Sequence, residues 1–266
     1  MIISVSRRTD IPSSHCEWFL ERLKEKTVAV QNPFYKNKFY NVDLSKENVD
    51  IIVFWSKNPN IDFLENVRDM GYEFYIHFTI TPYDKTVEKN IPNKKLLIKK
   101  FADISYKFGK EKIIWRYDPI ILNEKFDADY HIKNFSYMAD SLKDLTEECI
   151  FSFIQIYSKI KTVFKFINNN MDEQIELINN LNEIANKNHI VLKNCSQNFN
   201  NIAKSSCIDK ERIEKILGYA IKEKKDKGQR KLCNCIKSVD IGTYNTCYNG
   251  CIYCYANSKI LLFSKK

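Results

Sequence analysis

Short apolar runs rich in Ile, Val and Phe alternate along the chain with longer stretches in which apolar residues recur every three or four positions. The short runs predict strands at Ile2–Val5, Ile51–Trp55, Phe74–Phe78, Ile113–Trp115, Ile150–Ile154, Ile190–Leu192 and Ile236–Ile241. The longer stretches predict helices over Ser14–Lys24, Ile61–Met70, Lys94–Phe108, Asp129–Leu142, Met171–Lys187 and Asp209–Leu217. Alternating strands and helices are typical of an α/β fold with a parallel sheet. This many units favour a partial or complete (β/α) barrel over an open doubly wound sheet.

Two further features set the predicted organisation. The segment Val28–Leu44 lies between the first two βα units and predicts an extra hairpin or lid. Seven of the nine cysteines follow residue 194. We therefore expect residues 1–194 to form the body of the barrel and residues 195–266 to form a cysteine-rich region that completes it. A Gly-rich phosphate loop is absent from the sequence, which leaves a dinucleotide-binding or P-loop protein without support.

Polar side chains follow several predicted strands, at the point where each strand ends. The main members of this set are Arg7, Arg8, Asp10, Lys57, Thr79, Arg116 and Asp118. Because the carboxyl ends of parallel barrel strands form the active-site face, we expect these side chains to converge on one mouth. Arginine binds carboxylates through paired hydrogen bonds, so the three arginines suit an anionic ligand, with Lys57 as a further cation. The carboxylates suit ribose hydroxyls or the orientation of those arginines. A structural salt bridge under a loop is the alternative for each Arg–Asp pair.

Composition narrows the partners. The 266 residues carry a formal net charge of +9, which permits an anionic partner such as nucleic acid or a phosphorylated metabolite. A solvated basic surface is the other explanation. The sequence shows neither a signal-peptide core behind Met1 nor an apolar run of membrane-spanning length, so we expect a cytoplasmic protein without a membrane partner. In that compartment, nine cysteines indicate metal binding rather than disulfides.

The sharpest motif is a C-x3-C-x2-C triad formed by Cys247, Cys251 and Cys254. Three thiolates in so short a loop suit three irons of a 4Fe-4S cluster and leave the fourth iron open to a small molecule. Gly250 permits the tight backbone turn beside the middle cysteine. A structural zinc site closes with four ligands, commonly in C-x2-C pairs, so the triad predicts an open iron–sulfur cluster, with zinc as the alternative.

The triad, with Tyr253 just before its last cysteine, resembles the signature of the radical S-adenosylmethionine superfamily. A narrower resemblance depends on four further sequence segments: Ser4-Val-Ser-Arg-Arg-Thr-Asp10, Phe54-Trp-Ser-Lys-Asn-Pro59, Trp115-Arg-Tyr-Asp-Pro119 and Asp240-Ile-Gly-Thr-Tyr-Asn-Thr-Cys247. Together they resemble an uncharacterised prokaryotic domain-of-unknown-function family, which is distantly similar to spore photoproduct lyase. The resemblance implies that S-adenosylmethionine binds the open iron and is cleaved reductively to a 5′-deoxyadenosyl radical. That radical would then abstract hydrogen from an unknown substrate, for which damaged DNA is one candidate.

The resemblance also implies roles for individual residues and a partner. Tyr253 would contact the adenine of the cofactor, and Ser6 and Thr79 would belong to the cofactor site. A reductant such as ferredoxin or flavodoxin would supply the electron. The triad precedes the rest of the barrel in most of the superfamily but lies near the C-terminus here. A circular permutation reconciles the two orders, with the strand Ser238–Ile241 and the cysteine loop acting as the first βα unit. The usual Gly-Gly-Glu motif is absent.

Four more cysteines are available for a second site: Cys195, Cys207, Cys233 and Cys235. Four thiolates suit an auxiliary 4Fe-4S cluster or a closed zinc site. We favour the cluster because the cell must already deliver iron and sulfide to the neighbouring triad loop.

Other residues are assigned to the core or left without a role. Cys16 and Cys149 are expected to be small core residues. His77 is expected to be a hydrogen-bonded core residue, whereas His15, His131 and His189 are expected to be helical or to face solvent.

Two functions of other classes remain open. The first is a zinc-stabilised nucleic-acid-binding protein without catalysis, which contacts phosphates through Lys222–Lys231. Its structural cysteines would be Cys233, Cys235, Cys247, Cys251 and Cys254. The second is an iron–sulfur electron carrier.

Overall fold

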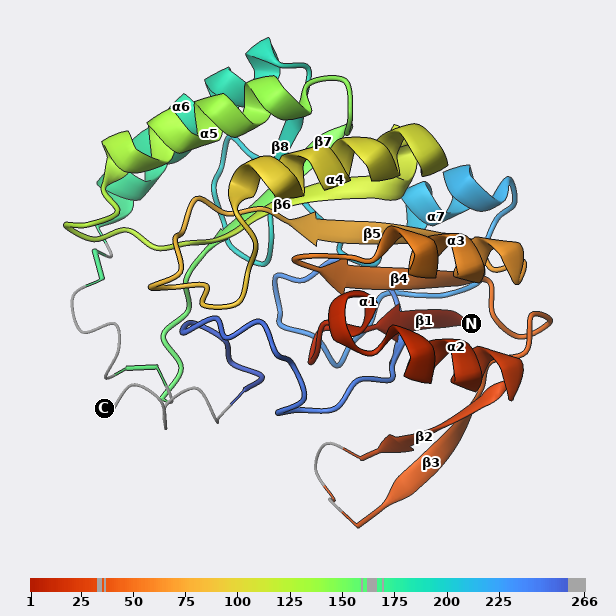
Figure 1. The fold of residues 1–266 in the computed structure, drawn as a ribbon. Helices are drawn as coiled ribbons and strands as arrows, with labels where there is room; N and C mark the ends of the chain where they lie inside the picture. Colours follow the sequence, from red (N-terminus) through yellow and green to blue (C-terminus); the bar gives the residue numbers. More distant parts are fainter. Residues whose placement is uncertain (33–34, 36, 159, 162–166, 169, 258–266) are drawn as a thin grey trace.

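A computed structural model describes residues 1–32, 35, 37–158, 160–161, 167–168 and 170–257. Its centre is an eight-stranded sheet in the order β10-β1-β4-β5-β6-β7-β8-β9 (Figure 1). The strands are β1 (Ile2–Val5), β4 (Ile51–Ser56), β5 (Phe74–Thr79), β6 (Ile113–Ile120), β7 (Glu148–Phe153), β8 (Val191–Asn194), β9 (Ala203–Lys204) and β10 (Val239–Asp240). Every neighbouring pair is parallel. The predicted α/β fold with a parallel sheet is therefore confirmed.

The strands differ from the prediction mainly at their ends. β6 continues past Trp115 to Ile120, and the strand expected over Ile236–Ile241 is only two residues long. The short strand β9 was not predicted. β9 and β10 lie at opposite edges of the sheet, and no ladder between them is found among the described residues. The described sheet is therefore open between these two edges. Of the predicted cysteine-rich region 195–266, residues 258–266 lie outside the described residues.

The helices are α1 (Ile11–Ser14), α2 (Cys16–Lys24), α3 (Ile61–Asp69), α4 (Lys94–Phe108), α5 (Ala128–Leu142), α6 (Met171–Lys187) and α7 (Lys210–Leu217). The helix predicted over Ser14–Lys24 corresponds to α2, and its first residue, Ser14, instead ends the short helix α1, which was not predicted. Each helix from α3 to α7 begins after an Asn or Asp whose side chain accepts a hydrogen bond from a backbone N–H of the first turn. These caps are Asn60, Asn93, Asp127, Asn170 and Asp209. Side-chain capping explains why the apolar periodicity located these helix starts well.

The two faces of the sheet pack into different cores because side chains alternate along each strand. Phe54, Ile76 and Trp115 belong to the larger core, which helices α2 to α6 cover (Figure 1). Val53 and Tyr75 belong to the core on the opposite face. That second core also contains Ile213 of α7 and the four cysteines of the predicted second site, Cys195, Cys207, Cys233 and Cys235. We call the face of the sheet that carries this second core the inner face, and the face that carries the larger core the outer face. The inner face therefore carries potential metal ligands as well as packing side chains.

Replacing Phe54 with alanine should lower the free energy of unfolding by about 3–5 kcal/mol, because it removes a fully buried ring. The ring meets Phe63 and Phe74 at centroid distances of 5.5 and 5.6 Å in edge-on geometry. Urea denaturation measures the loss. Phe39→Ala is the matched control, since this ring is 62% exposed on β3 (Phe39–Asp43) and its removal should change stability by less than about 0.5 kcal/mol. Equal losses in the two variants would contradict the packing argument.

The segment predicted as a hairpin or lid forms the antiparallel pair β2 (Thr27–Gln31) and β3. It projects from the end of α2 on the side of the molecule opposite α5 and α6 (Figure 1). The hairpin prediction is confirmed for the described residues. In the part of the chain that the model describes, none of the helices has both the length and the apolar character needed to span a bilayer.

Two histidines lie in the cores. His77 is fully buried on β5, and its Nε2 bonds to the carbonyl oxygen of Cys207 at 2.8 Å, as predicted for a core histidine. The prediction for His131 is only half right. It is helical, but it is fully buried, and its ring bonds to the Tyr117 hydroxyl and the Ile121 carbonyl, each at 2.9 Å. Burial lowers the pKa of His131 to about 4, so it packs as a neutral ring.

Candidate functional site

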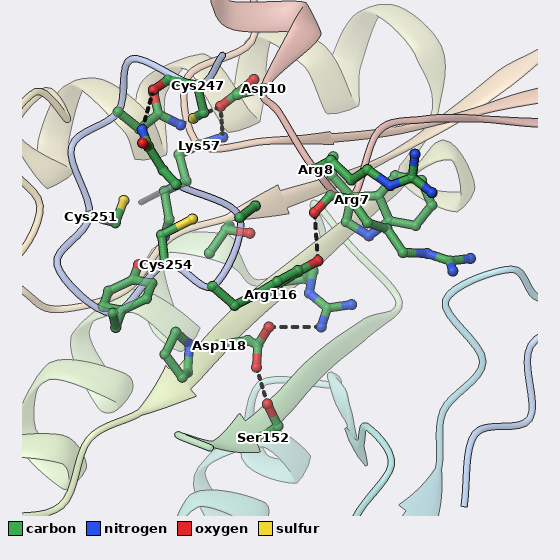
Figure 2. A pocket seen from close by; sticks show the side chains of 18 of the residues that line it. Arg7, Arg8, Asp10, Lys57, Arg116, Asp118, Ser152, Cys247, Cys251 and Cys254 are labelled. Atoms are coloured by element: carbon green, nitrogen blue, oxygen red, sulfur yellow. Dashed lines mark hydrogen bonds and ion pairs between the residues drawn. The ribbon is translucent and has the colours of Figure 1, made fainter. Parts of the chain in front are cut away.

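A cavity of about 310 Å³ opens at the carboxyl ends of the strands (Figure 2). Its lining includes Arg7, Arg8, Asp10, Lys57, Thr79, Arg116 and Asp118, the polar set expected at the strand ends. The three triad cysteines, Cys247, Cys251 and Cys254, line the same cavity together with Tyr253. The predicted convergence on one mouth is therefore observed. Ser6 is outside this lining, because its hydroxyl donates to Asp240 at 2.8 Å.

The triad loop is held by the segment that follows β5. The backbone N–H of Ile252 donates to the Val87 carbonyl at 3.0 Å, and Glu88 and Cys251 form an antiparallel bridge. Gly250 adopts φ +70°, and a Cβ there would lie 3.1 Å from the Cβ of Lys89. A side chain is disfavoured at Gly250 both by this conformation and by the close approach of the loops. The tight turn expected beside Cys251 is therefore present.

Glu88 is the main site residue that the sequence did not reveal. Its carboxylate is 1% exposed and accepts hydrogen bonds from Lys57 Nζ at 2.8 Å and Lys94 Nζ at 2.7 Å. The hydroxyls of Thr81 and Tyr253 donate to the same carboxylate. Burial raises the pKa of Glu88, but the two ammonium groups outweigh it and lower the pKa to about 2. A charged carboxylate thus lies directly behind the triad and fixes Tyr253.

Asp10 joins three parts of the site. Its Oδ2 accepts hydrogen bonds from the Lys57 backbone N–H at 2.8 Å and from the Asn249 side chain at 2.7 Å. Its Oδ1 accepts from the Ser13 N–H and so caps α1. Burial raises the pKa of Asp10, while these hydrogen bonds oppose the rise. Among the described residues, these hydrogen bonds of Asp10 connect loops and come from groups other than arginine, in contrast to the expected orientation of Arg7 or Arg8.

Arg116 and Asp118 form the pair that the sequence suggested. The Arg116 guanidinium donates to Asp118 Oδ2 at 2.8 Å, and Ser152 donates its hydroxyl to the other carboxylate oxygen (Figure 2). Arg116 also donates from Nη1 to Cys207 Sγ at 3.0 Å. Asp118 thus orients Arg116 toward sulfur. Neither Ser152 nor this sulfur contact was expected.

The other two arginines of the site, Arg7 and Arg8, follow the carboxyl end of β1. Arg7 places its guanidinium 5.3 Å above the ring of Trp55, which stacks on His77 at 5.1 Å. Arg8 lies 3.9 Å from Asp240 and 5.3 Å from the ring of Tyr244. Aromatic faces attract guanidinium groups without neutralising them. Positive charge is therefore available in the cavity wall.

The four remaining cysteines of the C-terminal region come together on the inner face of the sheet. Cys195 and Cys207 have their sulfurs 3.7 Å apart, and both line the cavity. Cys235 Sγ accepts from the Cys207 backbone N–H at 3.2 Å. The pKa of Cys233 is lowered to about 6, chiefly by its hydrogen bond with Cys235. The structure thus brings together the predicted second set.

The fit of these residues to metals depends on donor chemistry. All nine cysteines are free thiols, and seven of them form the two sets described above. Within the described ranges, no group of three or more His, Cys, Asp or Glu side chains is arranged as the ligands of one metal ion. Cysteine thiolates are the ordinary ligands of iron–sulfur clusters, in which different irons take different thiolates. The triad supplies such donors from one loop on a cavity wall, so its residues fit a cluster. Cys149, as predicted, is a buried core residue, and Cys16 is only half buried.

Comparison with known proteins yields one family match. A family model described as a domain of unknown function, DUF1848, matches residues 2–256. The matched region contains both sets of cysteines and the whole described sheet. No curated protein matches the chain.

Proposed function

Since the chain belongs to the DUF1848 family, whose description assigns no activity, we propose a function from the site itself. The protein is a radical S-adenosylmethionine enzyme that binds a 4Fe-4S cluster through Cys247, Cys251 and Cys254. The observation that carries this proposal is the triad of thiols from one short loop, lining a cavity at the carboxyl ends of parallel strands. When bound, the cluster would supply the electron that cleaves S-adenosylmethionine, and the resulting radical would abstract hydrogen from a substrate. A reductant such as ferredoxin or flavodoxin would deliver that electron.

The topology supports a circularly permuted partial barrel. β10 immediately precedes the triad loop and pairs in parallel with β1, with Ile3 opposite Val239 and Ser4 opposite Asp240. From there the sheet continues through β4, β5, β6, β7 and β8 in sequence order. The unit of β10 and its loop therefore takes the place of a first βα unit, although it comes last in the chain. This order is what a permutation of a barrel with an N-terminal cluster loop would produce.

The residues around the triad have distinct proposed tasks. Arg7, Arg8 and Arg116 bind carboxylate or other anionic groups in the cavity. Lys57 Nζ pairs with the Glu88 carboxylate at 2.8 Å, so Lys57 acts as a positioning residue on the side of the cavity that carries the triad. Tyr253 presents its ring to the cavity while its hydroxyl is held by Glu88, which suits contact with an adenine ring. Thr79 remains a candidate for the cofactor site because it lines the cavity, and Ser6 acts through Asp240.

Anaerobically purified protein, incubated with dithionite and S-adenosylmethionine, should form 5′-deoxyadenosine and methionine. Iron and acid-labile sulfide should be present in matching amounts, at about four or more of each per chain. Chromatography of the nucleoside and colorimetric analysis of iron and sulfide give the readouts. Zinc without sulfide, together with no 5′-deoxyadenosine, would overturn the proposal.

A hollow beside the cavity favours nucleic-acid binding as the second candidate function. Its volume is about 420 Å³, and it is lined by Tyr40, Tyr244 and Tyr255 together with Arg7 and Arg8. Exposed aromatic rings beside cations suit stacked bases and phosphates. A zinc-stabilised binding protein would bind single-stranded oligonucleotides with strong salt dependence and would contain no sulfide. An iron–sulfur electron carrier would contain sulfide but would form no 5′-deoxyadenosine.

A further inference from the structure

We propose that Cys195, Cys207, Cys233 and Cys235 hold a second iron–sulfur cluster, placed in the wall of the cavity that the triad lines. The spacing of these cysteines in the sequence leaves iron–sulfur and zinc equally open. Their convergence in the fold, and the hydrogen-bond donors around them, suit a thiolate-ligated metal centre next to the substrate space. This proposal does not depend on the radical chemistry proposed for the triad.

The four cysteines reach one place from three separate segments. Cys195 directly follows β8, Cys207 precedes α7, and Cys233 and Cys235 lie ahead of β10. Each is between 3% and 8% exposed, and all four belong to the inner core of the sheet. The Cys195 and Cys207 sulfurs are 3.7 Å apart, which is contact rather than a disulfide bond. Residues far apart in sequence thus form one buried group of thiols.

Positive charge lies directly against these sulfurs. Arg116 is 6% exposed and donates from its guanidinium to Cys207 Sγ at 3.0 Å, while Asp118 balances its charge. Arg7 is a second cation near Cys207 and Cys235, and the Asp240 carboxylate also acts on it. A metal centre with four thiolate ligands carries net negative charge, which would add to the compensation of Arg116 and Arg7.

Backbone donors point to the same conclusion. The N–H groups of Cys207 and Ile208 lie 3.2 and 3.4 Å from Cys235 Sγ and donate to it. Hydrogen bonds to cluster sulfurs and nearby charge are two of the levers by which proteins set the potential of an iron–sulfur centre. A neutral thiol is a weak acceptor, whereas a metal-bound thiolate suits two converging N–H donors. The site is therefore organised around electron-rich sulfur.

The position of this set relates it to the substrate space. Cys195 and Cys207 line the same cavity as Cys247, Cys251 and Cys254. Arg116 lines that cavity and donates to both Cys207 Sγ and Asp118 Oδ2. Figure 2 shows Arg116 and Asp118 in the same pocket as the three triad cysteines. A molecule bound in the cavity would therefore contact the surroundings of both sulfur sites. Because four cysteines would ligate all four irons, a cluster here would serve electron transfer beside the cavity rather than bind the molecule itself.

Metal analysis of three variants tests the proposal. We expect about eight irons with matching sulfide in the wild type, and about four of each in the triple variant Cys247→Ala, Cys251→Ala, Cys254→Ala. The double variant Cys207→Ala, Cys235→Ala should lose the iron of the second site and retain that of the triad. Cys16→Ala is the matched control, since this half-buried thiol belongs to neither set, and it should keep the wild-type content.

The triple variant decides the matter even if the double variant fails to fold. A folded triple variant without iron and sulfide, or with zinc in their place, would overturn the second cluster. Since this variant cannot bind the triad cluster, its iron content says nothing about S-adenosylmethionine cleavage, which the wild type tests separately. In the triple variant, Arg116→Gln should also move the midpoint potential of the remaining cluster to a more negative value, because the positive charge beside Cys207 is lost. An unchanged potential would contradict the role assigned to Arg116.

Discussion

Cys251→Ala is expected to reduce the formation of 5′-deoxyadenosine by about a hundredfold or more, which corresponds to at least about 2.7 kcal/mol of lost transition-state stabilisation. Cys251 is the middle residue of the triad, is 5% exposed, and lines the cavity. Its removal takes away one of the three thiolates available to the cluster on that loop. Alanine cannot replace a metal ligand, so the loss should be nearly complete. Chromatographic measurement of the nucleoside, with dithionite as reductant, gives the rate.

The effect should be one of ligand loss rather than of unfolding. Cys251 contributes a small side chain to the core, and its removal should lower stability by about 1–2 kcal/mol. Circular dichroism should therefore show an intact fold. Cys149→Ala is the matched control, because Cys149 is a similarly buried cysteine on β7 outside the lining of this cavity, and it should retain cleavage. Undiminished cleavage by Cys251→Ala with an intact cluster would exclude the triad as the radical site.

The fold was predictable from the sequence where burial and periodicity acted locally. The apolar runs located β1, β4 and β5 closely because strands of a parallel sheet are covered on both faces. The strand predicted over Ile236–Ile241 is longer than β10, because Ile236 and Ile241 are buried outside the strand. Ile236 packs in the inner core beside the cysteines, and Ile241 packs in the outer core after the strand has ended. Apolar character alone does not distinguish a strand residue from a buried loop residue.

The candidate site was predictable where residues follow strands and unpredictable where loops meet. Arg116 and Asp118 lie on β6, two positions apart, so the pleat places them on one face and brings them together. Glu88 lies in a loop whose sequence shows no hydrophobic periodicity. Its role in the site depends on Lys57 and Lys94, which reach it from other segments. A carboxylate flanked by lysines in sequence normally indicates a solvated surface. Only the tertiary contacts reveal that this one is buried.

Glu88→Gln is expected to lower the free energy of unfolding by about 3 kcal/mol at neutral pH, because it removes the carboxylate that forms ion pairs with two largely buried ammonium groups, those of Lys57 and Lys94. The pKa of Glu88 is lowered from 4.5 to about 2, and a shift of this size corresponds to about 3 kcal/mol. A carboxylate whose pKa is lowered by folding stabilises the protein fully above the unfolded pKa. That contribution is lost as the pH falls from 4.5 toward 2.

The pH dependence separates this charge effect from a general packing defect. Urea denaturation should show a smaller difference between wild type and Glu88→Gln at about pH 4 than at about pH 7, because the wild type loses its advantage as the unfolded carboxylate is protonated. Glu65→Gln is the matched control, since Glu65 pairs with Lys107 at 2.7 Å on the surface and should change stability by less than about 1 kcal/mol. A pH-independent loss in Glu88→Gln would instead identify misplacement of Tyr253 and the triad loop as the cause. Equal small losses in both variants would show that Glu88 does not stabilise the triad side of the cavity.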